Sequence, residues 1–306
     1  MEKKKLVFDN AEYFGETDEN NMPNGGGVMF YADNAYYDGE WLAGEKSGKG
    51  KMYYANKATY EGEWQHNKPH GVGVFNADNG EMYEGTFENG VMQGKGIYTF
   101  ADGGKYIGEF SENAFSGYGV LYFANETRYE GEFLNGKFNG EGSFYNQKGE
   151  VFTCQYINGI KNGSSVLLLA DKTEILADYY DNKIDGEVSI RYADGSSYKG
   201  GFVDGLPNGE GYYVFENGCK YQGGFENGNI NGYGTFIDRD DNIIFEGNTV
   251  QGLKEGQGVY YYENGFKYVG NYENNQKSGE GTIFVSDEES YKVESENGLV
   301  KNIESI

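Results

Sequence analysis

Carboxylates are the side chains whose number and spacing in this sequence could support catalysis. Glutamates recur at one repeat position, and further acidic residues recur two positions earlier. The first set is Glu40, Glu63, Glu109 and Glu132, and the second is Asp38, Glu61, Glu84 and Glu130. Two carboxylates about 5 to 10 Å apart in an enclosed pocket could hydrolyse a glycoside. Such regular spacing instead favours a solvated acidic face, so we predict that the chain is not an enzyme and has no catalytic residue.

Histidines and cysteines are the residues that could bind a transition metal. His66 and His70 are four apart, but Pro69 lies between them in an expected loop, and no thiolate or third imidazole is near in the sequence. Cys154 and Cys219 form neither a CxxC motif nor a disulfide framework. We therefore predict no metal site and no cofactor.

The net charge of −24 argues against several classes of partner. Nucleic-acid binding is not expected, because it depends on Lys and Arg neutralising phosphates. Membrane binding is not expected either, since the only basic cluster is Lys3–Lys5 and no apolar stretch reaches 18 residues. The apolar run after that cluster is too short for a signal peptide. We predict a cytoplasmic protein whose acidic face attracts a basic protein partner.

The elements that carry these residues follow from a repeat. The chain has 50 Gly, 29 Tyr and 20 Phe but only 3 Pro, a composition that favours strands and tight turns. One position recurs every 23 or 24 residues and is usually aromatic. It is occupied by Tyr13, Tyr37, Tyr60, Tyr83, Tyr106, Tyr129, Phe152, Ile175, Tyr198, Tyr221, Phe245, Tyr268 and Tyr291. We call these the anchor residues.

Each repeat contains an aromatic-x-Gly-x-aromatic segment and, further on, a Gly-x-Gly pair. Tyr60-Glu61-Gly62-Glu63-Trp64 has the alternation of a strand, and Gly71-Val72-Gly73 opens a second strand. Glycines leave room for side chains of neighbouring strands to stack over bare backbone. We predict an all-β, elongated, single-layer antiparallel sheet of stacked β-hairpins, with about 12 repeats and a length of about 110 Å.

This pattern resembles the MORN (membrane occupation and recognition nexus) repeat, because the Tyr-x-Gly-x-aromatic segment and the Gly-x-Gly pair recur in register. The resemblance implies a twisted hairpin sheet with a shallow groove lined by aromatics and glycines. It also implies a scaffold or peptide-groove binder, often in a cytoskeletal or ciliary assembly. Some members of the family form homodimers through their repeats.

The candidate groove residues are the two aromatics of each N-terminal segment, which could anchor an extended or helical segment of a partner. They are Tyr37, Trp41, Tyr60, Trp64, Tyr83, Phe87, Tyr106, Phe110, Tyr129 and Phe133. In the competing interpretation these side chains only stack on one another to hold the sheet together. Alternative functions are a phospholipid-associated targeting module, a carbohydrate-binding repeat protein, and a targeting arm for an enzyme.

We expect one array over residues 1–306. It divides into regular acidic repeats at 1–151, degenerate repeats at 152–190, and a second regular set with a cap at 191–306. The degenerate stretch replaces glycine by Cys154 and tyrosine by Ile175, and it contains the most apolar run of the chain. That run, Val166, Leu167, Leu168 and Leu169, is a candidate subunit or partner contact. The simpler interpretation is sequence drift that changes the local twist.

Overall fold

The structure is a computed structural model that describes residues 2–305. These residues form 27 β-strands and no helix. They divide into two compact units, one ending at Asn162 and the other starting at Gly163. This boundary lies within the degenerate repeats, and the expectation of a single array stays a prediction. The all-β class and the antiparallel hairpin repeats are confirmed.

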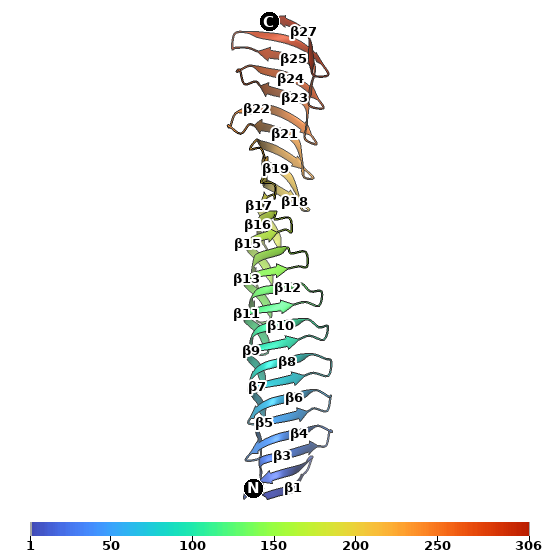
Figure 1. Cartoon of the computed structure of the whole chain (residues 1–306), viewed down its shortest axis with the longest axis vertical. Coiled ribbons are helices and arrows are strands. Elements are labelled where there is room, and N and C mark those ends of the chain that lie inside the picture. Colours follow the sequence, from blue (N-terminus) through green and yellow to red (C-terminus); the bar gives the residue numbers. More distant parts are fainter. Residues whose placement is uncertain (1, 306) are drawn as a thin grey trace. The chain divides into compact units, whose positions relative to one another are not determined.

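In the first unit each strand pairs antiparallel with the next one along the chain (Figure 1). Its strands are β1 (Glu2–Phe8), β2 (Ala11–Thr17), β3 (Pro23–Tyr31), β4 (Tyr36–Leu42), β5 (Glu45–Tyr53), β6 (Thr59–Gln65), β7 (Lys68–Asn76), β8 (Met82–Glu88), β9 (Val91–Thr99), β10 (Lys105–Ser111), β11 (Ala114–Tyr122), β12 (Arg128–Leu134), β13 (Lys137–Tyr145) and β14 (Val151–Ile157).

Strand β15 (Ile160–Leu168) contains the boundary, and the second unit continues the same pairing from β15 to β27. Its other strands are β16 (Glu174–Tyr180), β17 (Lys183–Arg191), β18 (Ser197–Val203), β19 (Leu206–Val214), β20 (Lys220–Glu226), β21 (Asn229–Ile237), β22 (Ile243–Val250), β23 (Leu253–Tyr261), β24 (Lys267–Glu273), β25 (Gln276–Phe284), β26 (Ser290–Glu296) and β27 (Leu299–Ser305).

From β4 onward a two-residue turn joins the two strands of each hairpin, whereas five residues separate β2 from β3. Between β6 and β7 the turn residues are His66 and Asn67, with φ of 49° and 65°. Positive φ at both positions matches the right-handed twist of the strands. The expectation that Pro69 and His70 belong to a loop is therefore wrong, because β7 starts at Lys68. The longer loops instead join one hairpin to the next.

The core of each regular repeat is an anchor tyrosine that lies on a pair of glycines. Tyr83 is 1 % exposed, and Gly85 is the direct cross-strand partner of Gly96. A Cβ added to either glycine would lie 2.5 Å from the Tyr83 ring or hydroxyl. Since real Cβ atoms do not approach other atoms so closely, both positions require glycine. The expected stacking of side chains over bare backbone is confirmed.

A β-bulge supplies the hydrogen-bond acceptor for this buried tyrosine. The register of β8 on β9 shifts after Gly85, and Thr86 has no direct partner on β9. Its carbonyl oxygen instead accepts a hydrogen bond of 2.9 Å from the Tyr83 hydroxyl. The same bond to the third residue after the anchor recurs in eight further repeats. The bulge therefore satisfies a polar group that burial would otherwise leave unpaired.

Aromatic contacts connect one repeat of the first unit to the next. The Phe87 ring meets its own anchor Tyr83 edge-on at 5.0 Å and the preceding anchor Tyr60 at 5.0 Å. Phe110 of the following repeat packs edge-on against Tyr83 at 4.8 Å. T-shaped pairs are favourable beyond the area they bury. Each anchor is therefore held by its own repeat and by the next one.

In the degenerate repeat of the second unit, several residues change together. Ile175 replaces the anchor tyrosine, and Ala177 and Val188 stand at the two glycine positions. Ala177 and Val188 are buried at 9 % and 0 % exposure, and Ile175 packs against their cluster. The smaller anchor leaves space that the added methyl groups fill. The repeat keeps its packing with another combination of volumes.

Candidate functional site

Strand alternation gives each hairpin two different faces. We call the side that carries the anchors the inner face, which in β6 and β7 includes Tyr60, Trp64 and Phe75. The opposite side, the outer face, carries residues such as Glu61 and Val74. Tyr60 and Trp64 are buried and Glu61 is exposed.

All ten candidate groove aromatics lie on the inner face, and all are buried at 0 to 6 % exposure. They form the aromatic contacts between repeats described above. Their role in binding stays a prediction, but their burial leaves little side-chain surface for a ligand. A partner on this face would mainly touch the residues around them.

A second set of inner-face aromatics in the first unit is only half-buried. Tyr98 packs edge-on against Phe100 at 5.1 Å and Phe115 at 6.2 Å, and Phe123 stacks with Phe144 at 6.2 Å. All five side chains have intermediate exposure. The sequence analysis did not propose them as candidates. The available signal was the apolar residue two positions after each Gly-x-Gly pair, such as Tyr98.

The predicted acidic residues lie on the outer face along open strands. Seven of the eight, including Glu61 and Glu84, are exposed on strands whose anchor tyrosines are buried. Several have structural partners there. The Glu63 carboxylate accepts a hydrogen bond of 3.4 Å from the Val72 backbone N–H, and Lys51 forms an ion pair of 2.8 Å with Glu61. Glu63 thus accepts a backbone hydrogen bond next to the bulge.

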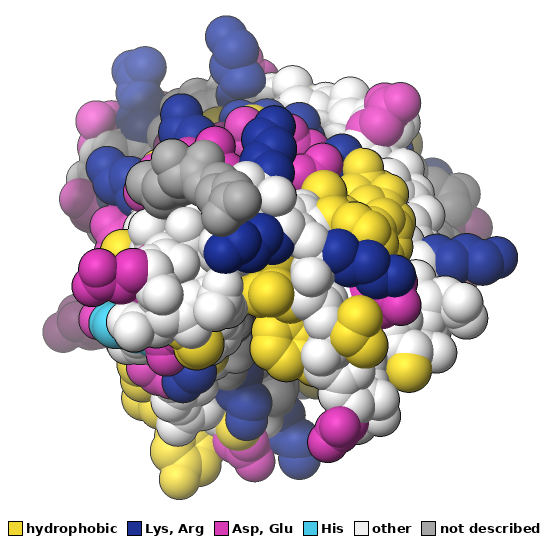
Figure 2. Space-filling view, turned by 90° about the horizontal axis from the view of Figure 1, so that it is seen from below, with side chains coloured by type: hydrophobic (Ala, Val, Ile, Leu, Met, Phe, Trp, Pro, Cys, Tyr) yellow, Lys and Arg dark blue, Asp and Glu magenta, His cyan; other side chains and the backbone are white. Residues whose placement is uncertain are grey.

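An aromatic ladder lies on the outer face at the N-terminal end of the first unit, where Phe14 and Phe30 are exposed and Tyr36 and Tyr53 are half-buried. Phe14, Phe30, Tyr36 and Tyr53 contact one another in sequence, with Tyr36 and Tyr53 stacked at 4.2 Å. The Lys51 ammonium lies 5.2 Å from the Tyr53 ring. Seen from that end in Figure 2, hydrophobic side chains gather in patches beside lysines and arginines. The sequence analysis did not identify this ladder.

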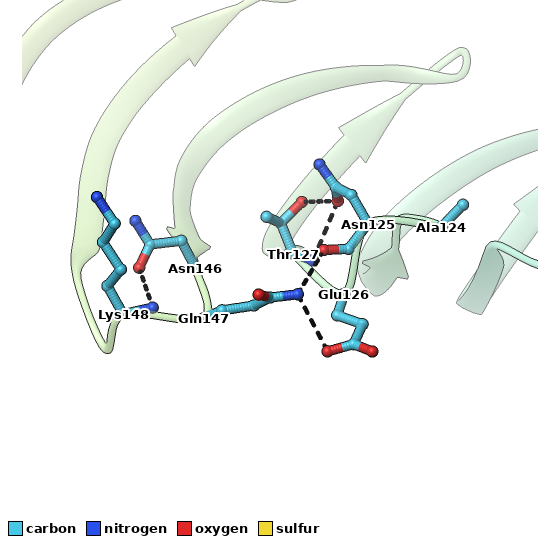
Figure 3. A pocket seen from close by; sticks show the side chains of 7 residues that line it. All are labelled: Ala124, Asn125, Glu126, Thr127, Asn146, Gln147 and Lys148. Carbon is cyan, nitrogen blue, oxygen red and sulfur yellow. Dashed lines mark hydrogen bonds between the residues drawn. The ribbon is translucent and has the colours of Figure 1, made fainter.

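The loops between hairpins form polar tips that contact one another. Gln147 donates hydrogen bonds of 3.0 Å to the Asn125 carbonyl oxygen and to the Glu126 carboxylate, which lie in the preceding loop (Figure 3). A shallow pocket lies between these two loops. The side chains that line it include amides, a hydroxyl, a carboxylate and an ammonium. The two hydrogen bonds from Gln147 fix the spacing of these neighbouring loops.

The apolar run of the degenerate repeats is divided between the faces. Val166 and Leu168 lie on the outer face at 39 % and 36 % exposure, whereas Leu167 and Leu169 are half-buried on the inner face. The run therefore does not form one patch of four residues. Its role as a subunit or partner contact stays a prediction.

The potential metal ligands do not converge. The His66 imidazole lies 2.8 Å from the Glu45 carboxylate in an exposed turn, and Cys154 is buried at a glycine position. Among residues 2–305, no group of three or more His, Cys, Asp and Glu side chains could hold a metal ion. Within the same range, the structure contains no helix long and apolar enough to cross a membrane.

Comparisons with known proteins give one family match. A family model described as MORN repeat matches residues 37–59, 60–82, 83–105, 106–128, 129–151, 198–220, 221–243, 245–267 and 268–284, which together exceed half of the chain. No curated protein matches the sequence.

Among solved structures, the TCP10 domain of Danio rerio CPAP in complex with a peptide of Danio rerio STIL has 14 % identity and a TM-score of 0.32. This match covers 81 % of our chain and 100 % of that chain. The SAS-4 (dCPAP) TCP domain of Drosophila melanogaster, in complex with a proline-rich motif of Ana2, has 11 % identity and a TM-score of 0.35. It covers 58 % and 90 % of the two chains.

Proposed function

Since the chain belongs to the MORN repeat family, we propose that it is a non-enzymatic scaffold that binds a segment of a partner protein on the inner face of its hairpins. MORN repeats fit a repeat-based scaffold. The observation that carries the proposal is the set of half-buried aromatics formed by Tyr98, Phe100 and Phe115 on this face. Rigid aromatic side chains beside exposed strand surface are typical anchors for a partner.

The charge of the chain specifies the partner further. The exposed carboxylates of the outer face and the net charge of −24 favour a segment whose flanks are basic. Such charges would speed association, while the inner-face aromatics would determine the rate of dissociation. The family resemblance adds a cytoplasmic location in a cytoskeletal or ciliary assembly to the proposal.

The test selects ligands from a random-sequence peptide library displayed on phage and measures their dissociation constants by fluorescence anisotropy. Tyr98→Ser removes an inner-face aromatic, and Tyr118→Ser is the matched control because Tyr118 is 62 % exposed on the outer face of the adjacent repeat. We expect Tyr98→Ser to weaken binding about tenfold or more and Tyr118→Ser to leave it nearly unchanged.

Circular dichroism of both variants would show that they remain folded. Equal loss of binding in the two variants would contradict the inner-face proposal, and so would a failure to select any peptide.

A further inference from the structure

One inner-face position covers the anchor of each repeat. It lies directly across the hairpin from the second aromatic position, and we call its occupant the lid residue. Most lid residues are apolar, and Phe115, for example, stacks on the anchor Tyr106 at 3.8 Å. Cross-strand pairing identifies the lid residues Pro23, Lys46, Pro69, Met92, Phe115, Phe138, Ile184, Pro207, Ile230, Lys254, Lys277 and Val300. In the Phe152 repeat the Lys161 ammonium lies 4.5 Å from the ring centre of the anchor.

Two consecutive repeats of the second unit have lysine as the lid. The Lys254 ammonium lies 4.6 Å from the ring centre of its anchor Phe245, and the Lys277 ammonium lies 4.5 Å from that of Tyr268. Both also lie beside the Tyr260 ring, at 4.9 and 5.9 Å. The two ammonium groups therefore lie beside the same aromatic ring.

No carboxylate neutralises this lysine pair. Neither residue takes part in an ion pair with another described side chain, and Lys277 donates its hydrogen bond to the Tyr262 hydroxyl. The nearby Glu246 and Glu255 accept hydrogen bonds from Tyr261 and from the Asn274 backbone instead. Burial and, secondly, the Lys277 charge lower the pKa of Lys254. Keeping both lysines charged at this position therefore costs free energy, although the chain is otherwise rich in acidic residues.

The hairpin that carries Lys277 also has a buried hydroxyl without a partner. Tyr272 is 5 % exposed, and its hydroxyl makes no hydrogen bond within the described structure. Tyr272 pairs directly with Lys277 across the hairpin, and the Lys254 ammonium lies 5.8 Å from its ring centre. The equivalent side chain is Trp or Phe in the regular N-terminal repeats, where no hydroxyl has to be satisfied.

We infer that Lys254, Lys277 and Tyr272 form a binding site for an oxyanion, a phosphate or carboxylate group, on the inner face of the second unit. Two ammonium groups and a phenol supply hydrogen-bond donors, and the aromatic rings reduce competition from water. An anion between the lysines would offset their repulsion and accept the hydrogen bond that Tyr272 lacks.

This inference goes beyond the proposed scaffold function. It states that a ligand of the second unit presents an acidic or phosphorylated group, whatever segment the first unit binds. Small anions serve as probes, so a negative result would leave the partner-segment proposal intact.

The experiment titrates inorganic phosphate with the full chain at neutral pH and follows the phosphorus NMR linewidth, with chloride keeping the ionic strength constant. The variants are Lys254→Met, Lys277→Met and Tyr272→Phe. Methionine retains an apolar stem on the aromatic rings, and phenylalanine removes only the unpaired hydroxyl. Lys46→Met is the matched control, because Lys46 is a lid lysine 5.2 Å from the Tyr37 ring centre without a second lid lysine beside it.

We expect each lysine variant to weaken phosphate binding about tenfold or more, because a hydrogen bond to a charged group is lost. Tyr272→Phe should weaken binding without lowering the thermal unfolding temperature, and Lys46→Met should bind as the original chain does. Displacement of phosphate by acetate would extend the site to carboxylates, and its absence would restrict it to phosphate. No broadening with the original chain, or equal losses in Lys46→Met and Lys254→Met, would overturn the inference.

Discussion

At the scale of single residues, the repeat signature is explained by the contact of one ring with two glycines. The tyrosine needs glycine on its own strand and on the next strand, because any Cβ there would overlap its ring. It also needs a free carbonyl, which the bulge provides. The glycines therefore belong to the packing of the anchor and are not evidence of a flexible or ligand-binding loop.

Two adjacent glycines of β3 test this explanation. A Cβ on Gly27 would lie 2.5 Å from the Tyr13 ring, whereas a Cβ on Gly26 would meet nothing within 4 Å. We expect Gly27→Ala to lower the free energy of unfolding by about 1 to 3 kcal/mol, as overpacking does, and Gly26→Ala to change it by less than about 0.5 kcal/mol. Urea denaturation of both variants measures the difference. Equal effects would show that the ring contact does not determine the glycine.

At the scale of the hairpin, a repeat tolerates substitution when its volumes change together. The Ile175 repeat has lost the tyrosine and both glycines, yet β16 and β17 retain the strand lengths of the regular hairpins. Coupled changes of volume account for this retention. The degenerate stretch is compatible with sequence drift and with a specialised contact. It is not compatible with a broken repeat, because both strands are retained.

This coupling predicts a rescue. Ile175→Tyr alone should destabilise the chain by about 1 to 3 kcal/mol, because its ring would meet the methyl groups of Ala177 and Val188. Adding Ala177→Gly and Val188→Gly should recover most of the loss, although Val188→Gly alone leaves a cavity and costs about 2 kcal/mol or more. Chemical denaturation of the single and combined variants gives the coupling energy. Additive losses would contradict the shared packing.

At the scale of the whole molecule, the stability of the chain depends on buried phenols. Burial raises the pKa of Tyr83 and of Tyr106 to about 12, and it raises the pKa of Tyr37 as well. The phenol of a tyrosine in the unfolded chain has a pKa of about 10. Since the folded-state pKa is the higher one, the stabilisation is complete below about pH 10 and is lost as the pH rises towards about 12.

We therefore expect cooperative alkaline unfolding between about pH 10 and pH 12. Tyrosinate absorbance from the anchors should rise together with the loss of the far-ultraviolet dichroism of the strands. Tyr83→Phe retains the ring but removes the ionising group and its hydrogen bond of 2.9 Å. It should cost about 1 kcal/mol at neutral pH and reduce the alkaline loss of stability. Ionisation of the buried phenols without loss of strand signal would contradict this account.

The all-β fold, the repeat and its period, and the exposure of the acidic residues could all be predicted from the sequence. These follow from local rules: alternation sets the faces of a strand, and the recurrence of Gly and Tyr sets the register. The sequence also marked the second-strand apolar position as buried or half-buried. It could not rank the aromatics by exposure, because all of them fit the same apolar face.

Which aromatics remain accessible depends on the packing of neighbouring repeats, which the sequence pattern does not show. Trp64 is enclosed by Tyr37 of the preceding repeat and by its own Tyr60, whereas Tyr98 stays half-exposed. The sequence likewise did not reveal that Lys254 and Lys277 lie beside the same Tyr260 ring. These residues are distant in the sequence and come together only when consecutive hairpins stack. Burial and charge pairing depend on contacts between repeats, and a linear pattern does not contain those contacts.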